Sequence, residues 1–412
     1  MKGSVVIVLA VLCAVCLAGR WAKPTVIIKS NLQLQFLAQA TDPHRNRTFF
    51  LYTREEGNDR FQLYVQTIDN DVVTPAVPLM KGRFHGLASD IVISGKSVFL
   101  ALNVRRAAGL KDYLDVYFVE SSDEGATWSE PVPMPRENLQ DPVNRFPPSI
   151  MTNEANTRVC VAYFRAPFAD ELGDIAMSCR PPDSKIFSPE ITVAKNQLLL
   201  SRVRVGATAH NRRVTMHMVY IAKVEGLTKL YYAASEDNGL HWSAKSLGDL
   251  PNIDEYREPS IATAKSDFKD ENMLLVYAFA GNGDAAVFMS TDKGTTWQRS
   301  SVSGSEKYTL TNVVLCKFKL GIWASYYARS TEIVDRRVDN EGRFNFWRVD
   351  TSSVRELDNP FTFEYRVLTV YRPQLGCSYF ADTYGIISAA AIAIHQDGSF
   401  AILYNRATGQ PN

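Results

Sequence analysis

Arginines stand at the ends of many short apolar segments of this chain, and guanidinium groups gathered in one place would recognise a carboxylate. Some precede such a segment: Arg145, Arg202 or Arg204, Arg257 and Arg372. Others follow one: Arg54, Arg105, Arg165 and Arg329. A guanidinium fork binds a carboxylate through two parallel hydrogen bonds. The alternative is that individual arginines pair with local acids such as Asp170, Asp174, Glu258 or Asp335.

Two carboxylates could supply acid–base chemistry beside these arginines. Asp59 follows Arg54 in LYTREEGNDRFQLYV, and Glu258 opens the apolar segment of YREPSI. An inverting glycosidase needs only two carboxyl groups, one on each side of the scissile bond. The sequence is compatible with that role for Asp59 and Glu258, and equally with Asp59 belonging to a charged hairpin loop.

Composition and motifs disfavour several other classes of function. The 412 residues carry a formal net charge of +1, which does not indicate a nucleic-acid groove or a polybasic membrane patch. The 6 histidines show no metal-ligand spacing. The chain also contains no G-x-S-x-G elbow, phosphate-binding loop or dinucleotide fingerprint. We therefore expect no metal and no cofactor.

An octapeptide closed by tryptophan recurs three times and sets the register of the chain. It reads SSDEGATW at 121–128, SEDNGLHW at 235–242 and STDKGTTW at 290–297. A degraded copy begins at Ser178, with Phe187 in the tryptophan position. Weaker relatives occur near residues 67 and 350. A spacing of about 55 residues between copies indicates a protein built from repeated structural units.

Each repeat contains four short segments of β-branched and aromatic residues, separated by Gly, Asp, Asn and Pro. This pattern predicts four antiparallel strands, of which the second is the most aromatic, as in TFFLYT at 48–53. Four-stranded antiparallel units repeated around an axis predict an all-β protein, a single β-propeller. First-strand starts and second-strand exits share one face of a propeller, so the arginines named above would line its mouth.

The number of blades follows from counting first strands. They are expected near residues 34, 88, 147, 204, 259 and 312, with another between 373 and 394. The last unit is short, and PTVIIK at 24–29 could supply its missing strand and close the ring. The count favours seven blades.

The octapeptide predicts a structural turn and no chemistry. Its aspartate can accept bonds from N–H groups of its own turn, its glycine can adopt positive φ, and its tryptophan can pack the turn onto its sheet. The residues in these positions are Ser121, Asp123, Gly125 and Trp128; Ser235, Asp237, Gly239 and Trp242; and Ser290, Asp292, Gly294 and Trp297.

The pattern S-x-D-x-G-x-T-W resembles the Asp-box repeat of the sialidase superfamily, with His241 replacing the threonine in the second copy. The resemblance implies six blades, with the boxes on the face opposite the active site. Sialidases hold a sugar carboxylate with three arginines and use an acid/base aspartate and a glutamate-activated tyrosine nucleophile. Arg54 and Arg329 match two of these arginines, Asp59 matches the acid/base and Glu258 matches the activating glutamate.

The same resemblance shows departures. The family's opening arginine has no counterpart in residues 31–39. Ser388 or Ala389 stands where the nucleophilic tyrosine is expected, and Asn405 stands in place of a glutamate. Tyr384 lies a few residues earlier and could be recruited as a nucleophile. The sequence therefore resembles a sialidase fold with a rewritten site.

The N-terminus predicts export. Lys2, an apolar run and the small residues Ala18 and Gly19 have the order of a signal peptide over residues 1–19. The alternative is an uncleaved membrane anchor. One propeller domain would then span residues 20–412, secreted or luminal, with no other membrane span.

An exported chain can form disulfides and carry glycans. Cys160, Cys179, Cys316 and Cys377 remain after cleavage, and Cys160–Cys179 is the first choice of pair because their strands are neighbours. Four free thiols are the alternative. Asn46 is the acceptor of the N-R-T sequon.

Three functions remain open. The first is a secreted propeller that recognises acidic, sialic-acid-type glycans or glycoproteins with degraded catalysis. Its candidate ligand-binding residues are Arg54, Arg145, Arg204, Arg257, Arg329 and Arg372. The second is an active exo-glycosidase that uses Asp59, Glu258 and Tyr384. The third is a propeller that binds another protein.

Overall fold

The structure is a computed structural model. It describes residues 20–21, 25–42, 45, 47–57, 61–82, 90–108, 111–135, 146–152, 158–166, 172–210, 213–250, 259–265, 272–279, 285–301, 308–318, 321–330, 333–334, 337–338, 342–349, 354–356, 361–362, 367–380, 384–395 and 397–409. Every regular element in these ranges is a β-strand, and every strand pairing is antiparallel. The all-β prediction is confirmed.

The N-terminal half of the chain forms sheets whose strands pair mostly in sequence order. The first contains β3 (Leu34–Thr41), β4 (Arg47–Glu55) and β5 (Phe61–Asp69), with β6 (Val72–Val73) and β7 (Val77–Gly82) on β5. The second contains β8 (Asp90–Ser94), β9 (Ser97–Ala108), β10 (Lys111–Ser121) and β11 (Val132–Pro133). An eight-stranded sheet contains β12 (Ser149–Thr152), β13 (Val159–Arg165), β14 (Gly173–Arg180), β15 (Ile191–Leu199), β16 (Arg204–His210), β17 (Arg213–Val224), β18 (Leu227–Ser235) and β19 (Ser243–Asp249).

The C-terminal half continues the pattern. One sheet contains β20 (Ser260–Lys265), β21 (Asn272–Phe279), β22 (Ala285–Ser290) and β23 (Gln298–Ser301). The next contains β24 (Tyr308–Phe318), β25 (Gly321–Ser330), β28 (Gly342–Val349), β29 (Val354–Glu356) and β30 (Phe361–Thr362), beside a small pair, β26 (Ile333–Val334) and β27 (Arg337–Val338). The last contains β31 (Val367–Phe380), β32 (Tyr384–His395) and β33 (Phe400–Gly409), joined by β1 (Arg20–Trp21) and β2 (Thr25–Ser30).

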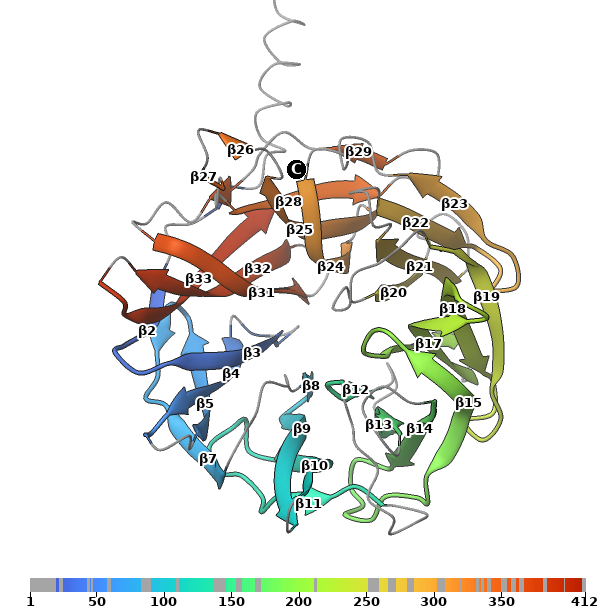
Figure 1. Cartoon of the computed structure of the whole chain (residues 1–412), viewed down its shortest axis with the longest axis horizontal. Helices are drawn as coiled ribbons and strands as arrows, with labels where there is room; N and C mark the ends of the chain where they lie inside the picture. The colour runs from blue at the N-terminus through green and yellow to red at the C-terminus, as the bar shows by residue number, and fades with distance from the viewer. Residues whose placement is uncertain are drawn as a thin grey trace, which may run out of the picture.

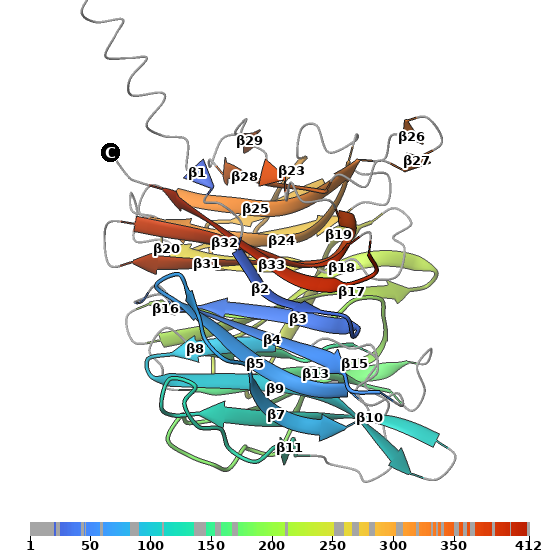
Figure 2. The same ribbon diagram turned by 90° about the vertical axis from the view of Figure 1, so that its left-hand side faces the viewer.

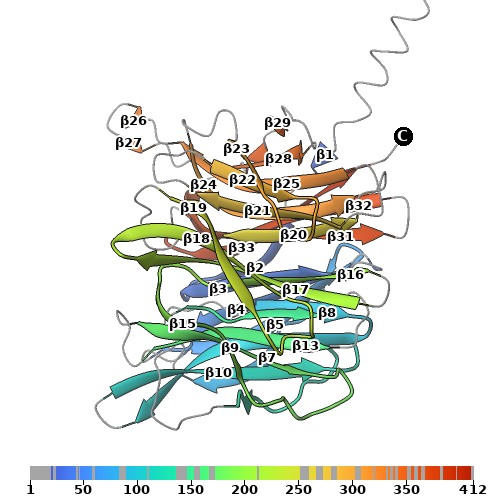
Figure 3. The same cartoon turned by 90° about the vertical axis from the view of Figure 1, so that its right-hand side faces the viewer.

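The sheets follow one another around a common centre, which is the arrangement of a β-propeller (Figure 1). Neighbouring first strands contact each other, and β31 contacts both β24 and β3. In the side views the axes of most strands are roughly aligned and run from one side of the picture to the other. Their ends therefore lie on two opposite faces of the molecule (Figures 2 and 3). Expected and observed first strands agree closely except the last, because β31 begins at Val367.

The hydrophobic core lies between neighbouring sheets. In β9, Val98, Leu100 and Leu102 pack toward the sheet of β3–β5, whereas Phe99 and Ala101 pack toward β13 and β14. Successive side chains of a strand point to opposite faces. A sheet covered on both faces therefore needs an uninterrupted apolar strand, which explains the continuous apolar runs.

Two strands from the N-terminus complete the C-terminal sheet. Strand β2 pairs with β33 from Thr25↔Tyr404 to Ser30↔Phe400, as the short last unit predicts. Tyr404 also reaches the neighbouring sheet, where its hydroxyl lies 3.2 Å from Thr48 Oγ1. Within the ranges that the structure describes, no helix is long and apolar enough to cross a membrane.

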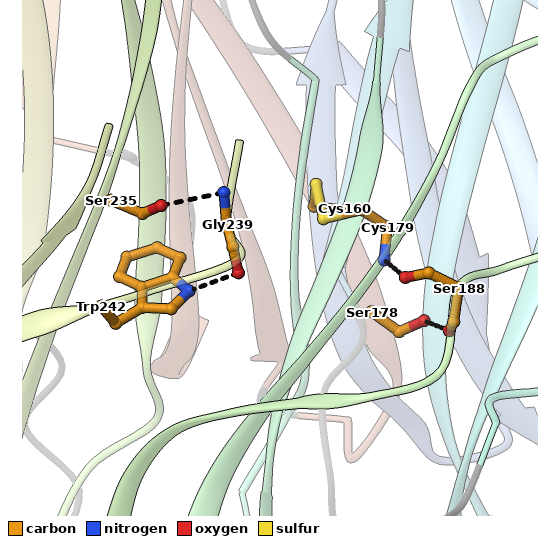
Figure 4. The surroundings of a disulfide bond; sticks show 7 residues. All are labelled: Cys160, Ser178, Cys179, Ser188, Ser235, Gly239 and Trp242. Carbon is orange, nitrogen blue, oxygen red and sulfur yellow. Dashed lines mark hydrogen bonds between the residues drawn. A yellow bond between two sulfur atoms is a disulfide. The ribbon is translucent and has the colours of Figure 1, made fainter. Parts of the chain in front are cut away.

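A disulfide joins the middle strands β13 and β14. Cys160 and Cys179 are directly opposite in the register of this pair and are bonded (Figure 4). Cys316 lies in β24 and Cys377 in β31, two strands that contact each other. The sequon residue Asn46 lies outside the described residues.

Candidate functional site

The two ends of the sheets differ in chemistry. We call the face where β3, β8, β12 and β16 begin the arginine end, because Arg54, Arg165, Arg202 and Arg204 lie there. We call the opposite face the box end, because β10, β18 and β22 end there at Ser121, Ser235 and Ser290, the first residues of the three octapeptides.

The three octapeptides form the same turn. In each, the serine hydroxyl donates to the aspartate at 2.8 Å and accepts the glycine N–H, and the tryptophan Nε1 donates to the glycine carbonyl. Figure 4 shows the serine–glycine and tryptophan–glycine bonds of the second turn, between Ser235, Gly239 and Trp242, beside the disulfide. The polar groups of the octapeptides thus bond mainly within their own turns, which fits a structural role.

The box glycines share a backbone conformation, and Gly125 and Gly294 also pack against the preceding sheet. Gly125, Gly239 and Gly294 all have φ between 86° and 89°. A methyl group added to Gly125 would lie 2.7 Å from Phe49, and one added to Gly294 would overlap the Tyr232 hydroxyl. Glycine is therefore required both by the backbone conformation and by the close approach of the neighbouring sheet.

The degraded copy at Ser178 uses different chemistry. Arg180 occupies the position of the box aspartate, and its side chain is 1% exposed and paired with Glu120 of β10. The guanidinium lies 4.7 Å from the ring centre of Phe118 and 5.3 Å from that of Phe187, which is within the range of cation–π attraction. Phe187 thus packs near this turn as the sequence predicted, but Arg180 bonds to a neighbouring sheet rather than its own turn.

The connection from β15 to β16 fixes the backbone on which Arg202 and Arg204 stand. Leu198 and Leu199 pair with β17, and the N–H of Leu200 donates to the carbonyl of Ile221. Ser201 Oγ accepts the N–H of Ile221. The chain therefore enters the arginine end held by hydrogen bonds to β17.

Asp90 is the central acid of this region and links three consecutive first strands. Its Oδ2 accepts hydrogen bonds from Ser149 Oγ and the N–H of Ile150, both at 3.1 Å. Arg202 Nη2 lies 2.8 Å from the same oxygen and also donates to the carbonyl of Pro148. The Arg202 side chain is 4% exposed, so this pair is a buried platform at the start of β8, β12 and β16.

Arg204 stands beside this platform in a more open setting. Its side chain is 26% exposed, and Nη1 lies 3.9 Å from Asp90 Oδ2. The sequence left Arg202 and Arg204 as alternatives at this position. The structure assigns them different environments: Arg202 is buried and bonded, and Arg204 is partly exposed to solvent.

Arg54 belongs to a second polar cluster at the arginine end. Its Nε and Nη2 donate to Glu56 Oε1 at 3.0 and 2.8 Å, and Nη2 also donates to the Tyr64 hydroxyl at 2.7 Å. The Tyr64 hydroxyl donates in turn to Glu56 Oε1 at 2.8 Å. Tyr52 stacks on Tyr64 with ring centres 5.6 Å apart.

Arg165 has a buried partner. It pairs with Glu190, whose side chain is 2% exposed and which also accepts a bond from the Tyr163 hydroxyl at 3.0 Å. The sequence predicts Arg165 at the mouth, with pairing of individual arginines to local acids as the alternative. The observed partner, Glu190, precedes β15, so this arginine ties strands of one sheet together.

The buried histidine of β17 is unsuited to acid–base chemistry. His217 is 0% exposed, and its ring nitrogens lie 2.8 Å from Thr208 Oγ1 and the Tyr232 hydroxyl. Burial lowers its pKa to about 3. No cluster of three potential metal ligands occurs among the residues that the structure describes.

Several predicted site residues cannot be placed by their side chains. Asp59, Arg145, Arg257 and Glu258 lie outside the described residues. For Arg105 in β9 and Arg329 in β25 the backbone alone is described. Arg329 pairs with Thr309 near the start of β24, which puts it at the arginine end.

Strand direction corrects two expectations in the last sheet. Phe400, just after the Asp397–Gly398 turn, pairs with Ser30, shortly before β3 begins, so this turn lies at the arginine end. Tyr384 starts β32 at the opposite end of the same sheet, the box end, so its backbone does not lie at the mouth where a nucleophile is needed. Arg372 lies within β31 rather than at its start.

Asp90, Glu56, Tyr64 and Glu190 were not identified from the sequence. Asp90 had one available signal, because it is an acid at the first position of the apolar first strand in LASDIVI. Glu56 and Tyr64 had no such signal, since their cluster depends on the fold of the β4–β5 hairpin.

Comparisons with known proteins identify the fold. No family model matches the chain, and no curated protein matches its sequence. Among solved structures, the K499G mutant of NanB sialidase from Streptococcus pneumoniae aligns over 88% of this chain and 84% of its own, with 10% identity and a TM-score of 0.52. Trypanosoma rangeli sialidase in complex with the inhibitor DANA aligns over 79% of this chain and 56% of its own, with 11% identity and a TM-score of 0.51. This chain has a sialidase-like β-propeller fold.

Proposed function

We propose that this chain is a secreted, seven-bladed propeller that binds carboxylate-bearing glycans at its arginine end without cleaving them as a sialidase does. The single observation that carries the proposal is the environment of Arg204. Two guanidinium groups, Arg202 and Arg204, share one carboxylate, Asp90. Of these two guanidinium groups, that of Arg204 is the more exposed, because its side chain is 26% exposed and that of Arg202 is 4% exposed.

Burial decides which arginine meets a ligand. A buried charge must keep its partner, because desolvation without a counter-charge is costly. Arg202 is therefore committed to Asp90. Arg204 lies farther from Asp90 and is partly solvated, so an incoming carboxylate can approach it without breaking a buried pair. Arginine at such a position favours a planar anion such as a carboxylate.

Binding without sialidase cleavage is favoured by the last sheet. In the register of β32 and β33, Ala389 faces Asn405, and Ser388 faces Arg406. These are the positions at which the family resemblance implies a tyrosine and a glutamate. Serine or alanine at the first position lacks the phenol of a tyrosine nucleophile, and Asn405 at the second lacks the carboxylate that would activate it. Tyr384 begins β32 at the box end and does not compensate.

The remaining parts of the proposal rest on topology and on the N-terminal sequence. First strands in mutual contact at β3, β8, β12, β16, β20, β24 and β31 support a ring of seven blades. The pairing of β2 with β33 supports closure of the last blade by the N-terminus. The signal-peptide pattern of residues 1–19 supports secretion.

Calorimetric titration tests the proposal. We expect the secreted protein to bind 3′-sialyllactose in preference to lactose, and Arg204→Ala to weaken that binding by about tenfold or more, since a charged hydrogen bond contributes roughly 1.5–3 kcal/mol. Arg299→Ala is the matched control, because Arg299 is an exposed arginine on β23 at the box end. Turnover of a fluorogenic sialoside, or equal affinity for lactose, would contradict the proposal.

A further inference from the structure

Two leucines are exposed at the arginine end, on hairpins of the sheet that contains Arg204. Leu172 immediately precedes β14 and is 56% exposed, and Leu227 is the first residue of β18 and is 51% exposed. Strands β14 and β18 both run from the arginine end to the box end. Single exposed apolar side chains are common on protein surfaces, whereas a group of them marks a binding site. The separation of the two leucines therefore decides whether they form a site.

Strand β15 joins the two hairpins at this end. Gln197 pairs with Gly173 of β14, and the next residue, Leu198, pairs with Lys223 of β17. Paired strands lie about 5 Å apart, so Gly173 and Lys223 lie about 10 Å apart on the two sides of β15. The two hairpins thus belong to one continuous eight-stranded sheet.

Each leucine stands next to one of these two positions. Leu172 immediately precedes Gly173. Leu227 pairs with Val224, which immediately follows Lys223 on β17. The two leucines therefore lie at neighbouring hairpin tips, one on each side of β15, and we call Leu172 and Leu227 the leucine pair.

The backbone on which the leucine pair stands is fixed. Leu227 follows the turn Glu225–Gly226, whose φ values of 51° and 81° are those of a two-residue hairpin turn. A methyl group added to Gly173, beside Leu172, would overlap the carbonyl of Arg165, so the strands of that hairpin approach closely. Because the backbone is already ordered, little conformational entropy is lost when a ligand covers these side chains.

The charged side chains around the leucine pair balance one another. The described lysines and acids on these strand ends are equal in number: Lys195, Lys223 and Lys229, and Asp174, Glu225 and Asp249. Lys229 pairs with Asp249 at 3.7 Å. A surface with balanced charges does not attract a second anion. The leucine pair therefore fits an uncharged apolar group.

The leucine pair is within reach of a glycan held at Arg204. Arg204 pairs with Val219 of β17, and Leu227 pairs with Val224, five positions later on the same strand. A strand rises about 3.3 Å per residue, which places Leu227 about 16 Å from Arg204 along β17. A trisaccharide has a comparable length. A ligand whose carboxylate meets Arg204 can therefore bring the group at its other end to the leucine pair.

We infer that the leucine pair is an apolar subsite for the aglycone of an acidic glycan, so that the chain prefers an acidic glycolipid to the free oligosaccharide. The inference rests on the proposed function, because it assumes a carboxylate held at Arg204. It assigns the two ends of one ligand to separate residues: the carboxylate to Arg204, and the apolar chain to Leu172 and Leu227.

Two synthetic glycosides test the inference: octyl 3′-sialyllactoside and methyl 3′-sialyllactoside, each kept below its micellar concentration. They carry the same sugars and differ only in the length of the alkyl aglycone. We expect calorimetry to show the octyl glycoside binding about fivefold more tightly, because its chain covers apolar surface of both leucines. The double variant Leu172→Ser, Leu227→Ser should lose this preference. Leu240→Ser is the matched control and should keep it, since Leu240 is 60% exposed but lies at the box end.

The outcomes separate this inference from the proposed function. If the methyl glycoside binds and the octyl glycoside binds no more tightly, the apolar subsite is wrong and the proposed function stands. A preference that survives in the double variant, or that disappears in Leu240→Ser as well, would show apolar association elsewhere and would also overturn the inference. If neither glycoside binds at any concentration tested, both proposals fail. Melting temperatures close to that of the unmodified protein establish that each variant is folded.

Discussion

The box end and the arginine end of this propeller use polar residues in opposite ways. At the box end, three turns with different intervening residues make the same set of bonds: serine to aspartate, glycine to serine and tryptophan to glycine. The aspartates are satisfied within their own turns. At the arginine end, residues of one type occupy different environments.

The arginines illustrate this difference. Arg202 is buried and forms an ion pair with Asp90. Arg165 forms an ion pair with the buried Glu190. Arg54 and Tyr64 both donate hydrogen bonds to Glu56 in a partly exposed cluster. Repetition of residue and environment together indicates a structural element of the fold. Repetition of a residue type alone does not indicate a structural element. The burial and the partners of each arginine show whether it stabilises the fold or is accessible to a ligand.

Arg202→Ala should give the largest effect on stability. It removes a 4% exposed guanidinium and leaves Asp90 without its closest cation, so we expect the free energy of unfolding to fall by about 3–5 kcal/mol. Arg204→Ala removes a partly exposed arginine and should cost about 1 kcal/mol or less. Denaturant unfolding followed by circular dichroism measures both. Equal losses in the two variants would remove the distinction between buried and accessible arginines.

Arg180→Asp should give the next largest loss of stability, although it restores the aspartate of the octapeptide pattern. The buried Arg180 lies near the rings of Phe118 and Phe187 and pairs with Glu120. Aspartate would put a second carboxylate near Glu120 and leave space beside the rings, so we expect a loss of about 3 kcal/mol. Arg180→Met, which fills the volume without charge, should cost less. A gain in stability from Arg180→Asp would mean that the degraded turn retains the box geometry.

The sequence predicted the fold better than the site, for a physical reason. Strand positions and box turns depend on residues close in the chain, so the periodic apolar runs and the S-x-D-x-G pattern were sufficient. The partners of the arginines depend on which strands meet. Asp90 contacts Arg202 only because β8, β12 and β16 begin side by side. Tyr384 was misplaced because its role depends on which end of β32 faces the mouth.

Gly294→Ala and Gly398→Ala compare the two ends directly. Both glycines have positive φ, +87° and +79°. A methyl group at Gly294 would overlap Tyr232 of the preceding sheet, whereas nothing lies within 4 Å of one at Gly398. We expect a loss of about 2–3 kcal/mol for Gly294→Ala and about 1 kcal/mol for Gly398→Ala in unfolding experiments. Similar losses would show that backbone strain alone accounts for the loss of stability and that the contact between sheets contributes nothing to it.

Acidification should produce the smallest effect, and most of it should come from the box end, where three of the four described aspartates with a lowered pKa lie: Asp123, Asp237 and Asp292, with Asp397 at the arginine end. Hydrogen bonds from the Thr127 side chain and N–H, and from Ser121, lower the pKa of Asp123 from 3.8 to about 2. Bonds from the His241 backbone and ring lower the pKa of Asp237 likewise. A carboxylate with a depressed pKa in the folded state stabilises the fold above its unfolded pKa, and the contribution is lost as pH falls from about 4 to about 2. Asp123 is exposed and Asp237 is partly exposed, so solvent screening keeps the contribution modest. Asparagine at position 123 cannot titrate. The melting temperature of Asp123→Asn should therefore decline less steeply than that of the unmodified protein between about pH 5 and about pH 2, a range that contains the unfolded pKa and reaches the folded one. An identical decline would mean that ionisation of the box aspartates does not contribute to the free energy of unfolding. The repeated turns would then be stabilised by the serine, glycine and tryptophan bonds alone.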